Sequence, residues 1–560
     1  MVSPSDVNET GSFPETASTR MTSYILSILL QFLASKEKIV RYRATQLVAH
    51  IINSLDSIDD EYYHLLKMGL LKRIRDKEPM VRVQAVLGLG RLAGNEDDGE
   101  QENDDSDDDD ATGLLEKLLD VLQNDPSADV RRSLLLNLPL TPGTLPFLLE
   151  RARDLDPATR RALYSRLLPA LGDFRHLSLS MREKLLRWGL RDRDENVRKA
   201  TARLFRERWI EDCAGPRITD DDGIKAEASA PTIDGLLELL ERIDVVNSGV
   251  EEGIATEAMR EFWDGRPDYQ DALSFDDPFW DHLSPESVFM ARTFNDYCHQ
   301  QGNGKYESIV EEKMPEVTKL AFFLQRYTNS LIECLRRNYE SYEGDEEEDT
   351  GEQEFIVEQL LHVAKTLDYS DEVGRRKMFS LLRETLAFPE LPDEITKLVV
   401  DVLRDICGFD AAGEREFCGV VLEAVAEVHD AVAFSESMAE NGDESFHSAL
   451  SAQGSDTTPT KTKGPKLLSD EKVSNDEEDE AKAIKEIVIN MKCLHIAQCM
   501  LQNVEGTLQQ NVHLVTMLNN LVVPAVRSHE APIRERGLLC LGLCCLLDKV
   551  SPTSFQSNLY

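Results

Sequence analysis

The sequence predicts an all-α fold of stacked helix pairs, and two observations support this prediction. The first is a unit written four times, in which an acidic turn is followed by an early arginine and an amphipathic run. It reads DKEPMVRVQAVLGLGRLAG from Asp76, NDPSADVRRSLLLNL from Asn124, DLDPATRRALYSRLL from Asp154 and DRDENVRKATARLF from Asp192. The second is composition, because Leu, Ala and Val dominate, aromatic residues make up only 7% of the chain and strand-like alternation is hard to find.

The spacing of the unit is typical of HEAT repeats. The arginine after each turn is Arg41, Arg82, Arg131, Arg160 or Arg198, at intervals of 41, 49, 29 and 38 residues. HEAT units are helix pairs of about 40 residues, and each must stack on its neighbours to bury its apolar face. We therefore predict a HEAT-repeat α-solenoid.

Residues 76–94 show how one unit is built. One helix face carries apolar residues at positions i, i+4, i+8 and i+11, namely Val81, Ala85, Leu89 and Leu92. Asp76 and Pro79 are expected in the turn, and Arg82 in the first turn of the second helix. Because a cation there opposes the helix dipole, we expect Arg82, like Arg131 and Arg198, to bond an acid of its own turn or of the next repeat.

Segments with little apolar content divide the chain into regions. The acidic insert 96–110 holds 11 acids and no base, and a second long segment is rich in Ser, Thr, Gly and acids. The predicted regions are a disordered N-terminus at 1–20, the solenoid at 21–432 with the insert 96–110 and an acidic loop at 343–354, a disordered phosphorylatable insert at 433–483, and further HEAT repeats at 484–560, expected to be a truncated array.

The charge of the chain is strongly asymmetric. The net charge is −41, which at first argues against a nucleic-acid partner. However, residues 21–95 and 111–210 together hold 30 Lys and Arg against 20 Asp and Glu. The N-terminal repeats are therefore basic while the remainder is acidic.

The sequence contains no catalytic or metal-binding motif, so we expect no cofactor and no metal. CxxC, HExxH and GxSxG patterns are absent. Cys540, Cys544 and Cys545 lie in an apolar segment that is expected to be helical, so we expect their thiols to be buried. The run FDDPFWDHLSPESVFMARTF is expected to anchor a connection between repeats or to bind a partner peptide, although its acids and His282 allow a catalytic reading that we reject. No apolar run is long enough to span a membrane, and we expect a reducing, intracellular compartment.

Several long strings resemble one known family. They include LSMREKLLRWGLRDRDENVRKA, FDDPFWDHLSPESVFMARTFNDYC and VVPAVRSHEAPIRERGLLCLGLCCLLDK. Together they are similar to the HEAT-repeat G-type subunits of condensin, condensin complex subunit 3. The resemblance implies a protein that is not an enzyme, binds the kleisin subunit, joins the SMC ATPase subunits through the complex and contacts double-stranded DNA without sequence specificity during mitotic chromosome condensation. Members of the family run well beyond this sequence, so a truncated chain or fragment is expected.

Basic side chains of the N-terminal repeats are the candidate DNA ligands. Phosphate contacts require clustered Lys and Arg and no base-reading motif. The candidates are Lys36, Lys38, Arg41, Arg43, Lys72, Arg73, Arg75, Lys199 and Arg203, with Lys67 and Arg206 beside them. The alternative for any one of them is a solvated helix face.

Thr458 begins the pattern Thr-Pro-Thr-Lys, which matches sites of cyclin-dependent kinases and predicts phosphorylation. The expected location is the nucleus and chromosomes, with the cytoplasm in interphase. The alternative function is an acidic HEAT-repeat nuclear transport receptor or scaffold for basic peptides, which would leave the basic N-terminal repeats without a role. Binding to duplex DNA or to a basic peptide distinguishes these functions.

Overall fold

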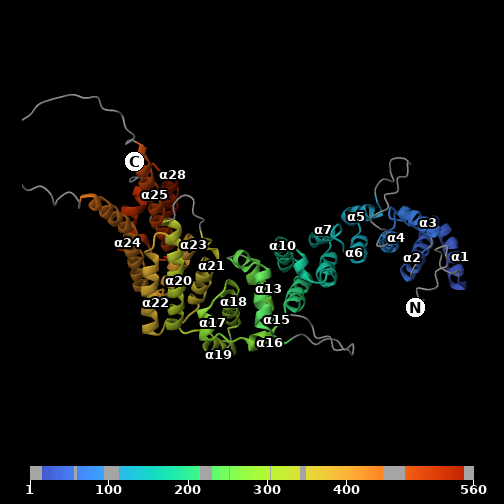
Figure 1. Cartoon of the computed structure of the whole chain (residues 1–560), viewed down its shortest axis with the longest axis horizontal. Coiled ribbons are helices and arrows are strands. Elements are labelled where there is room, and N and C mark those ends of the chain that lie inside the picture. The colour runs from blue at the N-terminus through green and yellow to red at the C-terminus, as the bar shows by residue number, and fades with distance from the viewer. Residues whose placement is uncertain are drawn as a thin grey trace, which may run out of the picture. The chain divides into compact units, whose positions relative to one another are not determined.

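The protein is helical throughout the described part of the chain, and no strand occurs there (Figure 1). The computed structural model describes residues 16–55, 58, 60–93, 113–214, 230–250, 253–302, 304–340, 348–444 and 473–547. The chain divides into two compact units, Met1–Ala272 (unit 1) and Leu273–Tyr560 (unit 2). The acidic insert 96–110 and Thr458 lie outside the described residues.

Unit 1 begins with three helix pairs, and its later second helices are interrupted by π-helical turns. Its elements are α1 Ala17–Phe32, α2 Lys38–Ser54, α3 Asp60–Arg73, α4 Pro79–Ala93, α5 Leu114–Asn124, α6 Ala128–Asn137, α7 Leu145–Leu149, η1 Glu150–Arg153, α8 Pro157–Ala162, η2 Leu163–Leu167, α9 Leu168–Ala170, η3 Phe174–His176, α10 Leu179–Leu190, α11 Glu195–Arg203, η4 Leu204–Trp209, α12 Ile210–Cys213, α13 Ile233–Arg242, α14 Val245–Ser248, α15 Ile254–Gly265 and α16 Pro267–Ala272.

The second helices of unit 1 stack in chain order, as HEAT repeats require. Helix α2 packs on α4, α4 on α6, α6 on α8 and α8 on α11. The predicted apolar face of α4 is confirmed, because its four residues Val81, Ala85, Leu89 and Leu92 are fully buried. Pro79 corrects one detail, since it is the first residue of α4 and not part of the turn. Its fixed φ and missing N–H suit that first position.

Two glycines of α4 allow its neighbours to approach closely. A Cβ on Gly88 would lie 2.8 Å from Leu70 Cδ1 and 3.5 Å from Ala49 Cβ. A Cβ on Gly90 would lie 3.1 Å from the carbonyl oxygen of Asn137. Helix α4 is therefore in tight contact with α2 and α6 near its C-terminal end.

Unit 2 contains longer helices around one large apolar core. Its elements are α17 Asp277–Asp281, α18 Pro285–Gln301, α19 Gly304–Lys313, α20 Val317–Glu340, α21 Gly351–Ala364, α22 Glu372–Leu386, α23 Asp393–Cys407, α24 Ala411–Glu444, α25 Val473–Gln502, η5 Leu508–Gln510, α26 Val512–Met517, η6 Leu518–Val522, α27 Val523–Val526 and α28 Ala531–Leu547. Helices α20 to α25 pack in sequence, and α28 packs on α25 and α27. Cys540 and Cys544 are buried in this core as predicted, whereas Cys545 is exposed.

The structure moves several boundaries predicted from composition. Helix α1 begins at Ala17, inside the predicted N-terminal segment 1–20. Helix α24 continues to Glu444 and α25 begins at Val473, so both extend into the segment 433–483. Helix α21 begins at Gly351, within the predicted loop 343–354. Helix-forming residues continue past the point where apolar content falls, which composition alone does not reveal.

Candidate nucleic-acid interface

The early arginine of four repeats in unit 1 joins two consecutive turns. Arg131 in α6 is the clearest case: its Nη1 donates to the carbonyl oxygen of Asp125, in its own turn, at 2.6 Å. Its Nε and Nη2 donate to the two carboxylate oxygens of Asp154, in the next turn, at 2.8 Å and 2.7 Å. One guanidinium therefore holds its own turn with one edge and the following turn with the other, in the bidentate geometry that favours arginine over lysine.

The same contact recurs along the unit, and we call the set the arginine–aspartate ladder. The four pairs, with their shorter ion-pair distances, are Arg41–Asp76 (2.9 Å), Arg82–Asp125 (2.8 Å), Arg131–Asp154 (2.7 Å) and Arg160–Asp192 (2.6 Å). Each arginine also donates through Nη1 to a carbonyl six residues earlier. The prediction that Arg82 and Arg131 bond turn acids is confirmed, and the acid belongs to the next repeat.

Each ladder aspartate also shapes its own turn. Asp154 accepts the backbone N–H of Asp156 at 2.9 Å, and Asp76, Asp125 and Asp192 accept the N–H two residues later in the same way. Burial by itself would raise the pKa of Asp154, but the hydrogen bonds from Arg131 and from the Asp156 N–H hold the pKa below its usual value. The carboxylate therefore stays charged and the turn stays closed.

Two of the predicted DNA ligands are engaged in the ladder. Arg41 is a ladder arginine, and the Nη1 of Arg73 donates to Asp76 Oδ2 at 2.9 Å. Both side chains are turned toward a carboxylate whose own side chain is almost fully buried. One carboxylate serves both guanidinium groups, so their positive charge is partly offset within the fold and both side chains are turned away from an approaching phosphate.

Other predicted ligands are exposed and available. The side chains of Lys36, Lys38, Lys72 and Arg75 are exposed, and in the described part of the chain none of them has an ion-pair partner. Arg43 is also exposed; its Nη1 donates to Gln46 Oε1 at 2.8 Å and its guanidinium lies 5.3 Å from the centre of the Tyr42 ring.

The two candidates of α11 carry local counter-charges. Lys199 Nζ lies 2.6 Å from Glu195, one helical turn earlier, and Arg203 Nε lies 3.4 Å from Glu207, one turn later. Both pairs are exposed, so each contributes little to stability and can open when a phosphate approaches. The structure thus separates the predicted set into engaged, available and locally paired cations.

The ladder also shows cations that sequence reasoning missed. Lys77, Arg153 and Arg193 are exposed and stand directly beside ladder aspartates. Arg153 lies 5.6 Å from the centre of the Trp188 ring, which orients its guanidinium. In the sequence each of these cations is adjacent to the acid of a turn, and this adjacency could have identified them as candidates. We call the turns 33–37, 74–78, 125–127, 154–156 and 191–194, with the residues flanking them, the turn edge.

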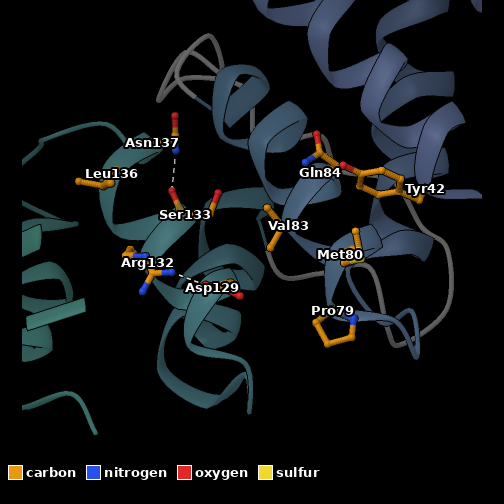
Figure 2. Close-up of a pocket in the computed structure, with 10 residues that line it drawn as sticks. All are labelled: Tyr42, Pro79, Met80, Val83, Gln84, Asp129, Arg132, Ser133, Leu136 and Asn137. Carbon is orange, nitrogen blue, oxygen red and sulfur yellow. Dashed lines mark hydrogen bonds and ion pairs between the residues drawn. The ribbon is translucent and has the colours of Figure 1, made fainter. Parts of the chain in front are cut away.

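An open groove lies beside the turn edge, between the N-terminal parts of α2 and α4 and the length of α6 (Figure 2). Its volume is about 460 Å³, and it is lined by Tyr42, Pro79, Met80, Val83, Gln84, Asp129, Arg132, Ser133, Leu136 and Asn137. Arg132 and Asp129 form an ion pair on one wall, so the groove combines an apolar floor with a polar rim.

The aromatic run at 275–294 forms a structural connection. Trp280, Phe289 and Phe294 are buried, and Asp276 caps α17 by accepting the N–H of Phe279 at 3.1 Å. The remaining acids pair with cations, Asp277 with Lys319 and Asp281 with Arg326. The anchoring role predicted for this run agrees with these contacts.

Two searches of the described residues bear on other classes of site. No group of three or more His, Cys, Asp or Glu side chains among them is arranged to hold a metal ion. No helix within the same residues is long and apolar enough to cross a membrane.

Comparison with known proteins gives one family over nearly the whole chain. Condensin complex subunit 3 of Schizosaccharomyces pombe is 38% identical over 527 residues, which are 94% of this chain and 54% of that protein. The subunit of Saccharomyces cerevisiae is 30% identical over 568 residues, covering 95% of this chain and 50% of that protein. The chain therefore spans about half the length of these curated relatives.

A family model and a solved structure agree with these relatives. The model described as nuclear condensing complex subunits, C-terminal domain, matches residues 492–557. The crystal structure of the S. pombe condensin Cnd3-Cnd2 subcomplex superposes with a TM-score of 0.70 at 36% identity, covering 95% of this chain and 56% of that one. Stacked helix pairs and these matches lead to the same conclusion: over nearly its whole length the chain is similar to condensin complex subunit 3.

Proposed function

We propose that this chain is a non-catalytic condensin subunit that binds double-stranded DNA along the turn edge of unit 1. The observation that carries the proposal is the row of exposed cations beside the ladder. Each ladder arginine faces a carboxylate, so the two charges cancel. The ladder pairs therefore add nothing to the net charge of the turn edge. The side chains left over at the turns include Lys36, Arg75, Lys77, Arg153 and Arg193, and all are exposed.

The overall charge of −41 does not prevent such binding. Charges farther than about 10 Å from a phosphate are largely screened at physiological salt, whereas a clustered cation acts at contact distance. Two acids beside the turn edge are engaged: Asp129 pairs with Arg132, and Asp194 caps α11 by accepting the N–H of Asn196 at 2.8 Å. Local charge therefore favours a polyanion on this edge.

The turn edge supports sequence-independent recognition. Lysine and arginine contacts to phosphates fix the position of a duplex without reading its bases. The repeated turns place such cations at intervals along the stack of helix pairs. This arrangement suits the repeating phosphates of a DNA backbone. We therefore expect the affinity to depend strongly on salt and weakly on sequence.

We further propose that the subunit works with a kleisin and, through it, with the SMC ATPase subunits on chromosomes in the nucleus. The solved relative is a complex of Cnd3 with Cnd2, which supports a kleisin partner for this chain. Phosphorylation of Thr458, predicted from the sequence, stays a proposal, since that residue lies outside the described part. The contacts with kleisin and SMC subunits are to be mapped on the full complex.

A charge-reversal experiment tests the DNA site. The test variant changes Lys36, Lys38, Arg75 and Lys77 to Glu; the matched control changes the exposed unit 2 residues Lys305, Lys319, Arg375 and Lys377 to Glu, with the same change in net charge. Affinity for duplex DNA is measured by fluorescence anisotropy over a range of salt concentrations. We expect the test variant to weaken binding to all sequences alike and to lower the salt slope by about 0.9 for each phosphate that is no longer bound. Loss of binding in the control with normal binding in the test variant would place the site in unit 2.

A further inference from the structure

The ladder has a fifth arginine, Arg198 in α11, which makes only half of the usual contacts. Its Nη1 donates to the carbonyl oxygens of Asp192 at 2.8 Å and Arg193 at 3.2 Å, as in the four complete pairs. Its Nε and Nη2 face no carboxylate within ion-pair distance among the described residues. The expectation that Arg198 bonds a turn acid is therefore met only through the carbonyl groups of its turn.

The Nε and Nη2 edge of the Arg198 guanidinium, which we call its open edge, is oriented to bind a partner with two oxygens. In the complete pairs, the same Nη1 contacts orient the guanidinium so that Nε and Nη2 meet two oxygens of one carboxylate at 2.6–3.2 Å. Arg198 has the same local contacts but an exposed side chain. Because its Nη1 edge is already fixed, less conformational entropy is lost when two oxygens bind the other edge.

The surroundings of Arg198 favour an anion. The nearest acids are occupied: Asp192 pairs with Arg160 at 2.6 Å, Asp194 caps α11, and Glu195 pairs with Lys199 at 2.6 Å. Arg193, five residues before Arg198 and in the same turn, is exposed and has no ion-pair partner in the described ranges. The turn thus presents two cations and no acid that is still available.

We propose that the open edge of Arg198 binds one backbone phosphate of duplex DNA, with Arg193 beside it. Two phosphate oxygens match the two donors as the carboxylate oxygens do in the ladder. A DNA phosphate is favoured over a carboxylate of a partner protein because Arg198 continues the row of exposed cations at the turn edge. The inference rests on the proposed DNA-binding function and names one contact within it.

Arg534 in α28 offers a matched control within the same chain. Its Nη1 donates to the carbonyl oxygens of Ser528 at 3.0 Å and His529 at 3.3 Å, which reproduces the contacts of Arg198. Its side chain is likewise exposed. However, Arg534 belongs to unit 2, whose residues 273–560 contain 26 Lys and Arg against 52 Asp and Glu. The same local geometry therefore occurs there in an acidic setting that disfavours DNA.

The experiment measures binding of the full chain to duplex DNA for three variants, Arg198→Ala, Arg198→Lys and Arg534→Ala. We expect Arg198→Ala to weaken binding by about tenfold, since charge-assisted hydrogen bonds are removed, and to lower the salt slope by about 0.9. Arg198→Lys keeps the charge but not the paired donors, so affinity falls while the salt slope stays close to wild type. Arg534→Ala is expected to bind DNA as the wild type does.

The outcomes separate this inference from the proposed function. Normal DNA binding by Arg198→Ala, together with weaker binding after reversal of Lys36, Lys38, Arg75 and Lys77, would overturn the inference and leave the turn edge intact. Absence of DNA binding by the wild-type chain would overturn both. A loss of thermal stability in Arg198→Ala well beyond that in Arg534→Ala, which loses the same carbonyl contacts, would show that a carboxylate of this protein already fills the site, and would also overturn the inference. An unchanged melting temperature with weakened DNA binding supports it.

Discussion

The two units stabilise their buried cations in different ways. In unit 1 four buried or half-buried arginines meet the carboxylate of the next repeat, whereas the buried Arg182 donates to the carbonyl oxygens of Arg242 and Arg175. In unit 2 the buried Arg404 donates through Nε to the carbonyl oxygen of Asn503 at 3.0 Å, and the buried Lys492 donates to the carbonyl oxygen of Leu391 and to Thr396 Oγ1. Other cations of unit 2 also donate to carbonyl oxygens, such as Lys313 to that of Leu273 at 2.7 Å.

This difference relates stability to function. Repeated pairing in unit 1 cancels charge in the interior of the turns and leaves the exposed cations in a row at their surface. In unit 2 the buried cations are held mainly by backbone oxygens, and acids predominate in the sequence, with 52 Asp and Glu against 26 Lys and Arg. The same fold class therefore gives a basic edge in one unit and an acidic composition in the other.

The largest expected effect comes from removing one ladder aspartate. Asp154→Ala leaves the guanidinium of Arg131 buried without its carboxylate and opens the Asp156 turn contact. Loss of one partner of a buried pair costs about 3–5 kcal/mol in the free energy of unfolding. Urea unfolding of the full chain, with hydrogen exchange to localise the change to α6 and α8, measures it.

Asp129→Ala is the control for this change, because the Asp129 side chain is 69% exposed and its pair with Arg132 is worth less than about 1 kcal/mol. Equal decreases in stability for the two variants would contradict the view that the ladder, and not surface pairing, stabilises unit 1.

The second effect distinguishes the buried Lys492 of unit 2 by its response to pH. Burial lowers the pKa of Lys492 to about 8, whereas its unfolded value is about 10.4. Between these values the unfolded state binds more protons, so this group makes the free energy of unfolding rise with pH, by up to about 3 kcal/mol. The difference between the wild type and Lys492→Met is measured by urea unfolding from pH 7 to pH 10.5.

Nearby groups also affect this region, including Asp393, Arg536 and the raised pKa values of the Cys493 and Cys499 thiols, but they are present in both proteins. The difference therefore isolates the lysine. Parallel stability curves for wild type and variant would show that Lys492 does not titrate in this range.

A third, smaller effect tests close helix contact in unit 1. A Cβ on Gly189 would lie 2.2 Å from Thr201 Oγ1 and 2.8 Å from Tyr164 Cζ. Both neighbours are fixed by hydrogen bonds, Thr201 to the carbonyl of Val197 and Tyr164 to that of Leu185. Gly189→Ala should therefore lower the free energy of unfolding by about 1–3 kcal/mol, as overpacking does, and melting curves would reveal it. An unchanged melting temperature would mean that α10 and α11 separate easily.

The smallest effect has the opposite sign and lies in unit 2. Gly542 is inside α28, and a Cβ added there would meet no atom within 4 Å. Gly542→Ala should raise the free energy of unfolding by about 0.5–1 kcal/mol, because alanine loses less backbone entropy in a helix. The same melting measurement applies, and a decrease would indicate a contact at the exposed face of α28, where Leu538, Leu539 and Leu546 are exposed.

The sequence by itself determined the features that depend on neighbours along the chain. The repeated turn and early arginine predicted helix pairs, the buried face of α4 and the bonding of Arg82 and Arg131 to turn acids. These follow from helix periodicity and turn chemistry, which act over a few residues. They were sufficient to identify a basic N-terminal array before any contact was known.

Only the tertiary structure decided which cations remain available. Arg41 and Lys38 look equivalent in the sequence, but Arg41 bonds Asp76, 35 residues away, while Lys38 stays exposed. Arg198 repeats the pattern of Arg131, yet only Arg131 meets a carboxylate of the next turn. Lys492 reaches a carbonyl group 101 residues away in sequence. Such partners are set by how repeats stack, because a hydrogen bond needs donor and acceptor within about 3 Å, and sequence distance carries no such information.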